Sequence, residues 1–227
     1  MHFAIDADIF MQVVSPALED SDLAKLGRLV RCRWRPRQLA HLVRHDDVHI
    51  RRTAALTLGI VGDSTVIGCL ARALVDSDDQ VHRVAEQGMW SIWFRGGDPE
   101  ASRPFHEGME LLGQQTYARA AEQFETAVRI DPEFAEAHNQ CAIAYYLHSQ
   151  WRESLRCSGN AVRLMPTHFG ALSGMGHCLM ELGEPARALR CYHGALQINP
   201  RMDAIASTAR RLESALELLA GSSDDKI

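Results

Sequence analysis

The sequence predicts an all-helical (all-α) fold, an α-solenoid of stacked antiparallel helix pairs. In the second half of the chain, Pro132, Pro166 and Pro200 stand 34 residues apart. Apolar residues between them recur at i, i+3, i+4 and i+7, which is the spacing of a helix with one buried face. A second repeat, with a shift of 31 residues, lies in the first half. Because fixed periods of this length are typical of helix-pair arrays, we expect two arrays, at residues 1–98 and 99–227.

Charge and hydropathy argue against several other classes of protein. The formal net charge of −5 is mild, and neither half has the strongly basic balance of a dedicated nucleic-acid domain. No apolar stretch approaches the roughly 18 residues that a membrane-spanning helix needs. The start of the chain, with Asp6 and Asp8, lacks the basic-then-apolar order of a secretory signal. We therefore expect a cytoplasmic protein.

The cysteines show no close pair, such as C-x-x-C, that would bind zinc or exchange disulfides. Free cysteine behaves as a small apolar side chain. We therefore expect reduced, mostly buried thiols, and we expect neither a metal nor a cofactor. The six residues are Cys32, Cys69, Cys141, Cys157, Cys178 and Cys191.

At an offset of 31 residues, the segment 46–55 aligns with the segment 77–85. The aligned pairs are Ile50/Val81, Arg52/Arg83 and Ala54/Ala85. In each segment an acidic turn precedes a β-branched residue, a base and small residues. This pattern resembles the short HEAT-like repeat, which implies two units over residues 36–98 and a degenerate unit at 15–35.

The acidic turns of these units have a structural explanation. A carboxylate at a helix start interacts favourably with the helix dipole, and an arginine one turn further along the same helix can pair with it. Gly59 and Gly62 indicate the end of the helix in the first unit. The segment from Arg95 to Pro99, with its two glycines, is typical of a join between two arrays.

An arginine-rich run surrounds Trp34. Arginines beside an aromatic residue suit phosphate contact and base stacking, and a basic surface also suits anionic lipid or an acidic protein. The alternative is a solvated face that Glu19, Asp20 and Asp22 neutralise. The five arginines of this basic patch are Arg28, Arg31, Arg33, Arg35 and Arg37.

Three histidines follow one another at intervals of four: His41, His45 and His49. On one uninterrupted helix this spacing would align them as metal ligands. Because residues 46 and 47 are aspartates that indicate a turn, we expect the alignment to break after His45 and expect no metal site.

Two tryptophans, Trp90 and Trp93, lie at the end of the second HEAT-like unit. We expect them to seal the junction between the two arrays. If they are exposed instead, they mark a binding patch, since aromatic residues dominate interface hot spots.

At the 34-residue offset, small residues align at three places of each repeat, and such residues let two helices approach closely. The aligned sets are Gly108/Ala142/Gly176, Ala120/Ser154/Ala188 and Ala127/Ala161/Ala195. Together with the recurring proline, they resemble the tetratricopeptide repeat, a 34-residue helix pair. The resemblance implies three units, at 101–134, 135–168 and 169–202, then a capping helix at 203–220 and a frayed tail.

The resemblance also implies a binding site. Tetratricopeptide arrays usually bind an extended peptide on a concave groove lined by the first helix of each unit. The residues carried over to that groove are Phe105, Met109, Asn139, Ile143, Tyr146, Ser173, His177 and Met180. The subclass that grips chaperone C-terminal tails has a lysine and an asparagine at the places of Phe105 and Met109. We therefore expect a protein or peptide partner other than a chaperone tail.

These features favour a non-catalytic protein–protein interaction scaffold or adaptor. One alternative is nucleic-acid or anionic-surface binding through the basic run from Arg28 to Arg37. Another is a HEAT-like enzyme, of the bilin lyase or metal hydroxylase type. The hydroxylases use several His-Glu pairs, whereas this chain has only His106-Glu107. Because it also lacks a Gly-rich phosphate loop and a G-x-S-x-G motif, we expect no enzymatic activity.

Overall fold

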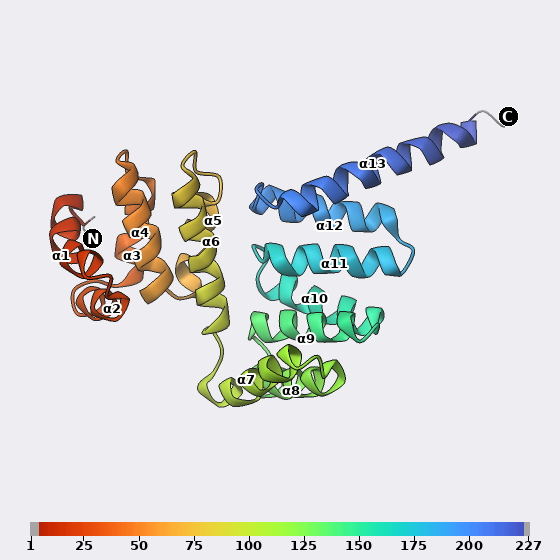
Figure 1. Cartoon of the computed structure of the whole chain (residues 1–227), viewed down its shortest axis with the longest axis horizontal. Helices are drawn as coiled ribbons and strands as arrows, with labels where there is room; N and C mark the ends of the chain where they lie inside the picture. The colour runs from red at the N-terminus through yellow and green to blue at the C-terminus, as the bar shows by residue number, and fades with distance from the viewer. Residues whose placement is uncertain (1–4, 225–227) are drawn as a thin grey trace. The chain divides into compact units, whose positions relative to one another are not determined.

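The computed structural model describes residues 5–224 of the chain, and within that span it contains helices and turns but no strand. This confirms the predicted all-helical fold. The chain divides into two compact units, Met1–Gly96 and Gly97–Ile227, each built of helix pairs (Figure 1). Every helix among the described residues is too short or too polar to span a bilayer.

The first unit contains six α-helices and two short 3-10 helices in its described part. In chain order the α-helices are α1 (Ala7–Glu19), α2 (Leu23–Arg31), α3 (Pro36–Leu39), α4 (Val48–Val61), α5 (Ile67–Ala73) and α6 (Asp79–Phe94). The 3-10 helices are η1 (Ala40–Arg44) and η2 (Ser64–Val66). The first two α-helices pack against each other, so the segment read as a degenerate unit at 15–35 belongs to a helix pair that begins at Ala7.

Helices α4 and α6 cross closely because each presents a glycine at the crossing. A Cβ atom added to Gly59 would lie 2.7 Å from the Cα atom of Gly88. The expectation that Gly59 ends its helix is therefore wrong, because α4 continues to Val61 and the glycine is needed for the close approach. Gly62 does follow the last residue of α4, as its cap.

Trp93 is 3% exposed, and its ring lies edge-on to that of the half-buried Trp90 at 4.9 Å between centroids. Trp93 therefore does not belong to an exposed aromatic patch. The expectation that both tryptophans seal a junction stays a prediction.

Up to residue 224, where its described part ends, the second unit contains three helix pairs and a final helix. In chain order the helices are α7 (Pro99–Gly113), α8 (Tyr117–Ile130), α9 (Ala135–Leu147), α10 (Trp151–Leu164), α11 (Phe169–Glu181), α12 (Pro185–Ile198) and α13 (Asp203–Asp224). Each helix packs against the next, which gives the stacked arrangement in the green-to-blue part of Figure 1.

Helix α13 closes the second unit by burying Ile205 and Ala209 in a cluster that includes Tyr192 of α12. It thereby covers the apolar face that a terminal repeat would otherwise expose. The expected frayed tail from Gly221 is wrong in part, because the helix continues to Asp224. The remainder of that tail, residues 225–227, lies outside the described residues.

The turn inside each helix pair has the same geometry. Gln115, Ser149 and Gly183 occupy equivalent places and have left-handed backbones, with φ of 60°, 60° and 74°. In each turn two backbone N–H groups donate to carbonyls of the last helical turn, as the N–H groups of Gly183 and Glu184 do in the third pair. Only the third turn has the glycine that this conformation favours.

Candidate functional site

The candidate site is a pocket in the second unit, between α9, α10 and α11. It has a volume of about 130 Å³. Four of the predicted groove residues line it: Asn139, Ile143, Tyr146 and His177. The other lining residues are Ala142, Leu147, Ser154, Ser158, Gly170 and Gly174.

The pocket exists because the middle repeat lacks an aromatic side chain. In the flanking repeats Phe124 and Tyr192 are fully buried, and each ring lies where a Cβ atom on the glycine of the facing helix, Gly108 or Gly176, would collide with it. The middle repeat has Ser158 at the place of these aromatic residues. The volume that a ring would fill stays open and forms part of the pocket.

The two serine hydroxyls in the pocket wall bond to backbone carbonyls. The Ser154 hydroxyl donates to the carbonyl of Ala142 at 2.7 Å, and the Ser158 hydroxyl donates to the carbonyl of Ser154 at 2.9 Å. A ligand group in this pocket therefore contacts mostly carbon atoms and two hydroxyls that already donate hydrogen bonds to the backbone. Such a wall favours an apolar ligand side chain.

His177 and Tyr146 form a polar rim. The Tyr192 hydroxyl lies 3.0 Å from His177 Nδ1. Because burial raises the pKa of Tyr192 to about 12, its O–H group is available to donate to that nitrogen. Burial also lowers the pKa of His177, so the imidazole is neutral at pH 7. The Tyr146 hydroxyl is 3.5 Å from a carboxylate oxygen of Glu181, which places a negative charge at the rim.

The remaining predicted groove residues differ in accessibility. Phe105 is 1% exposed, and its ring lies 4.8 Å from that of Phe134 and 5.8 Å from that of Phe124. Its assignment to an open groove is therefore wrong, because it belongs to an aromatic core cluster. Ser173 is also nearly buried, and its hydroxyl donates to the carbonyl of Gly170. Met109 is half-buried and Met180 is exposed.

A buried carboxylate lies beside the pocket residue Asn139. Glu136 accepts a hydrogen bond from the Asn139 amide at 3.1 Å and from the Gln140 amide at 2.6 Å. Its second oxygen is 2.8 Å from His168 Nε2, and both side chains are fully buried. Since the backbone N–H of Ala171 donates to His168 Nδ1, Nε2 carries the hydrogen that points at Glu136. No sequence signal identified this link between successive repeats.

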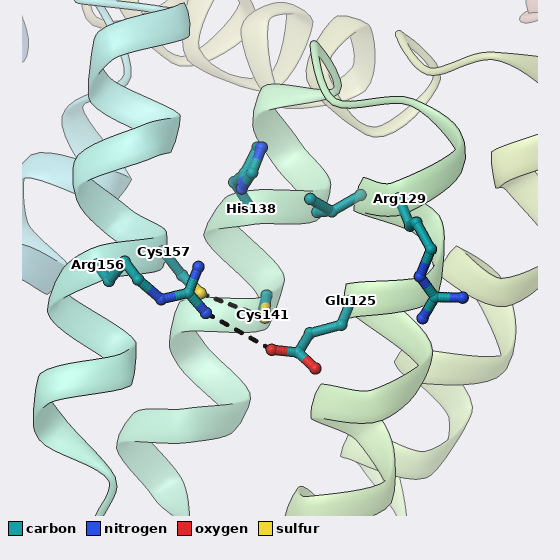
Figure 2. Close-up of a pocket in the computed structure, with 7 residues that line it drawn as sticks. Glu125, Arg129, His138, Cys141, Arg156 and Cys157 are labelled. Carbon is teal, nitrogen blue, oxygen red and sulfur yellow. Dashed lines mark hydrogen bonds and ion pairs between the residues drawn. The ribbon is translucent and has the colours of Figure 1, made fainter.

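A second pocket, of about 260 Å³, lies between α8, α9 and α10. Figure 2 shows two sulfur atoms in its wall, Cys141 Sγ and Cys157 Sγ, which are 3.4 Å apart. The sequence predicted separate buried thiols. Cys69, Cys141, Cys157 and Cys178 are indeed buried and free, whereas Cys32 is exposed. The proximity of two of them was missed, because it depends on how two helices face each other.

The five arginines of the basic patch are all exposed in the first unit, on α2, α3 and the segment between them. Two of the nearby acids contact groups outside the patch. Asp20 pairs with Lys25 at 2.7 Å, and Asp22 caps the start of α2 through the N–H of Lys25. One guanidinium, that of Arg31, donates to the carbonyl of Ile60. The recorded contacts of Asp20 and Asp22 are thus with Lys25 and not with an arginine of the patch, whereas Asp63 interacts electrostatically with Arg37. Neutralisation of the patch by Glu19, Asp20 and Asp22 stays a prediction.

The three spaced histidines do not share a helix. His41 lies in η1, His45 caps the end of that segment, and His49 lies in the first turn of α4. The backbone N–H of Asp47 donates to His45 Nδ1, which uses one of the nitrogens that a metal would need. Among the described residues, no group of three histidine, cysteine or acidic side chains has the geometry of a metal site.

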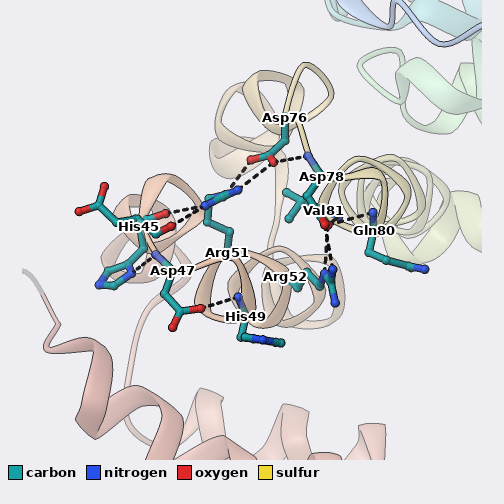
Figure 3. A network of polar contacts seen from close by, with 10 residues as sticks. His45, Asp47, His49, Arg51, Arg52, Asp76, Asp78, Gln80 and Val81 are labelled. Atoms are coloured by element: carbon teal, nitrogen blue, oxygen red, sulfur yellow. Dashed lines mark hydrogen bonds and ion pairs between the residues drawn. The ribbon is translucent and has the colours of Figure 1, made fainter.

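The acidic turns of the first unit serve as helix caps and links between repeats (Figure 3). Asp47 caps α4, and Asp78 caps α6 by accepting from two backbone N–H groups. Arg51 forms a bidentate ion pair with Asp76, and Arg52 forms one with Asp78. The expected pairing of arginine and acid within one helix is therefore wrong, because these guanidinium groups reach the turn of the next repeat.

These pairs set the charge state of the turn. The Arg52 guanidinium and the N–H of Val81 hold the pKa of Asp78 well below its usual value. Burial acts to raise the pKa of Asp76, but the hydrogen bonds from Arg51 lower it overall. Both carboxylates therefore stay ionised at neutral pH and act as structural anions.

Comparison with known proteins gives family matches in both units. A model of HEAT repeats matches residues 26–90. A model of the TPR repeat matches residues 108–149, and a model of the tetratricopeptide repeat matches residues 169–202. A TPR repeat-containing protein of Rhizobium etli is 30% identical over 81 residues, which are 36% of this chain. The chain spans about two fifths of the length of that relative, since the match covers 40% of it.

Solved structures with a similar fold are tetratricopeptide domains. The first such domain of Spaghetti (RPAP3), bound to an HSP90 peptide, has a TM-score of 0.51 and 20% identity, covering 53% of this chain and 97% of that one. The Sgt2 domain from Aspergillus fumigatus has a TM-score of 0.51 and 19% identity, covering 53% and 82%. At these identities the likeness concerns the fold alone.

The repeat families predicted from the spacing of prolines, small residues and acidic turns are thus confirmed. This chain is a protein that combines HEAT repeats, over residues 26–90, with tetratricopeptide repeats, over residues 108–149 and 169–202.

Proposed function

We propose that this protein is a non-catalytic scaffold or adaptor whose second unit binds an extended peptide segment of a partner protein. The observation that carries the proposal is the 130 Å³ pocket at the predicted groove positions of the middle repeat. Its size suits one apolar side chain. Asn139, Tyr146 and His177 stand around it, and their polar atoms can orient the backbone of such a segment.

We expect the groove to bind this apolar segment in preference to an acidic chaperone tail. The Spaghetti domain is bound to the HSP90 peptide SRMEEVD, so the fold itself is compatible with such tails. The comparisons thus do not support excluding a chaperone tail, and that exclusion stays a prediction. It rests on the absence of clamp side chains, because the corresponding places hold the buried Phe105 and Met109. The carboxylate of Glu181 at the rim also disfavours an acidic ligand.

The test is a selection of peptides from a random displayed library on the full chain, followed by titration of an enriched peptide. We expect the Tyr146→Ala/His177→Ala variant to bind it at least about tenfold more weakly, a loss of about 1.4 kcal/mol. An Arg33→Glu/Arg35→Glu variant is the control and should bind it like the wild type. The peptide SRMEEVD, titrated in the same way, should not compete. Equal binding by the groove variant would contradict the proposal.

A second candidate function rests on the exposed basic patch of the first unit. The patch can bind a polyanion, because its five guanidinium groups are exposed. Binding of single-stranded nucleic acid or of anionic vesicles would then fall with rising salt and disappear in the Arg33→Glu/Arg35→Glu variant. Binding that is unaffected by this charge reversal would exclude the patch as the site.

A further inference from the structure

The thiols of Cys141 and Cys157 form the only cysteine pair in contact among the described residues. Cys141 lies on α9 and Cys157 on the antiparallel helix α10, with 3.4 Å between the sulfurs. A disulfide bond requires about 2.05 Å between sulfurs, so side-chain rotation and a small shift would close the gap. Cys178, which is equally buried, has the hydroxyl of Ser154 beside it at 2.9 Å and not a second thiol.

A small molecule can reach this pair through the pocket in Figure 2. Both cysteines are almost completely buried, but both line the pocket of about 260 Å³. The other residues that line it are Glu125, Val128, Arg129, His138 and Arg156. The Arg156 side chain is 60% exposed, so it borders solvent. A bulky reagent is excluded from the sulfurs, whereas a molecule of the size of hydrogen peroxide fits in the pocket.

The two sulfurs share one hydrogen bond, and Arg156 favours the thiolate of either. The contact with Cys141 lowers the pKa of Cys157, although burial opposes this. The same contact and burial raise the pKa of Cys141. The negative charge of Glu125 acts to raise the pKa of Cys157. This carboxylate also pairs with Arg156 at 3.5 Å and accepts a hydrogen bond from the Tyr145 hydroxyl at 2.6 Å. Thiolates are the nucleophiles in peroxide reactions, so one sulfur of the pair can attack the oxidant while the other lies close enough to react with the product.

We propose that Cys141 and Cys157 are an oxidative modification site at which a hydroperoxide, such as hydrogen peroxide, converts the two thiols into an intramolecular disulfide. The Cys157 thiolate attacks one peroxide oxygen, the O–O bond breaks, and hydroxide leaves as Cys157 becomes a sulfenic acid. Cys141 loses its proton and attacks the sulfenic sulfur, which releases the second oxygen as water. The two sulfurs together lose two electrons, and the peroxide is reduced to two molecules of water. A dithiol reductant reverses the reaction.

The modified site joins the two helices of the middle repeat by a covalent bond. Cys141 lies on the same helix as the pocket residues Asn139 and Ile143, so the bond fixes α9 against α10 next to the candidate groove. The proposal does not depend on the peptide-binding function, because the reaction needs only the two thiols and the oxidant.

The experiment treats the reduced, folded chain with graded hydrogen peroxide and removes the peroxide. The chain is then unfolded in the presence of an alkylating agent, so that buried thiols are also blocked, and the products are mapped by mass spectrometry. In the wild type we expect a non-reducing digest to contain the Cys141–Cys157 linked peptides, before Cys178 is modified. The mass of the chain should fall by that of two hydrogen atoms, and dithiothreitol should restore it.

Three variants assign the roles of the thiols. In Cys141→Ser, Cys157 should stop at a sulfenic acid that dimedone traps when the treated protein is unfolded in its presence. In Cys157→Ser, Cys141 should stay unmodified. Cys178→Ser is the matched control, because it also replaces a buried thiol, and it should form the linked peptides like the wild type. Circular dichroism checks that each variant is folded.

Two results would overturn the proposal. In the first, both thiols of the wild type are still fully alkylated after a peroxide dose that oxidises the exposed Cys32. This result does not depend on any variant, so a misfolded variant cannot cause it. The other is equal trapping of a sulfenic acid at Cys141 in the Cys157→Ser variant, which would contradict the assigned roles.

Discussion

At the scale of single residues, the second unit is held by polar groups that the hydrophobic repeat pattern does not reveal. The carboxylate of Glu136 is fully buried and has three donors, from Asn139, Gln140 and His168. A buried polar group is tolerated when its hydrogen-bonding capacity is used, and it becomes costly when one partner is removed. Glu136 therefore fixes the start of α11 relative to α9.

Replacing Glu136 by alanine should be strongly destabilising, because it leaves His168 and two amides buried without their acceptor. We expect a loss of about 1–3 kcal/mol in the free energy of unfolding, because the donors left behind are neutral. Glu136→Gln keeps one acceptor oxygen and should cost clearly less. Urea denaturation followed by circular dichroism measures both losses. A cost below about 1 kcal/mol for the alanine variant would contradict the buried network.

Two histidines make stability depend on pH. Burial lowers the folded-state pKa of His138 and of His177 below the usual 6.5. As the pH falls below about 6.5, the unfolded chain takes up these protons first, so the free energy of unfolding decreases. We expect lower thermal stability at about pH 5.5 than at about pH 7.5. The difference should shrink in a His138→Gln/His177→Gln variant, and an unchanged difference would exclude these two groups as its cause.

At the scale of the helix pair, the three repeats of the second unit share one turn but not one turn residue. Gly183 takes the left-handed backbone without strain, whereas Gln115 and Ser149 adopt it with a Cβ atom in place. The same hydrogen bonds close all three turns. The two polar residues therefore retain a cost that the third turn avoids.

Ser149→Gly should stabilise the protein, because glycine removes the steric cost of the positive φ. We expect a gain of about 0.5–1 kcal/mol, less the entropy that glycine adds to the unfolded chain. The control is Gly183→Ser, which introduces the same strain at the third turn and should destabilise. Thermal unfolding of both variants checks the signs. A destabilised Ser149→Gly variant would contradict the description of the turn.

At the scale of the whole molecule, the sequence predicted the helix pairs because their spacing is a one-dimensional signal. The signal consists of the prolines at 34-residue intervals and the small residues such as Gly108 and Gly176. The resemblance to the tetratricopeptide repeat, and not the spacing itself, implied the groove positions, of which Asn139, Ile143, Tyr146 and His177 line the pocket. That the residues of this pocket bind a ligand stays a prediction.

Features that depend on contacts between helices were not predicted. Phe105 occupies a groove position by its repeat number, but Phe124 and Phe134 surround it. Ser158 stands at the 34-residue offset from Phe124 and from Tyr192, but the cavity beside it depends on the helices that face it. Likewise, 16 residues separate Cys141 from Cys157, and only the facing of two helices brings their sulfurs together.

The central claim is that the space left by Ser158 receives a side chain of a bound peptide, and filling that space tests it most directly. The variant Ala142→Gly/Ser158→Phe reproduces the pairing of Gly108 with Phe124 in the preceding repeat. Gly159→Ala is a control on the same helix, where an added Cβ atom meets open space.

The measurement is calorimetric titration of a library-selected peptide into the wild type and both variants, each with its helical circular dichroism checked. We predict that the filled variant stays folded and binds at least about tenfold more weakly, while the Gly159→Ala control binds like the wild type. A folded Ala142→Gly/Ser158→Phe variant with wild-type affinity would contradict the claim.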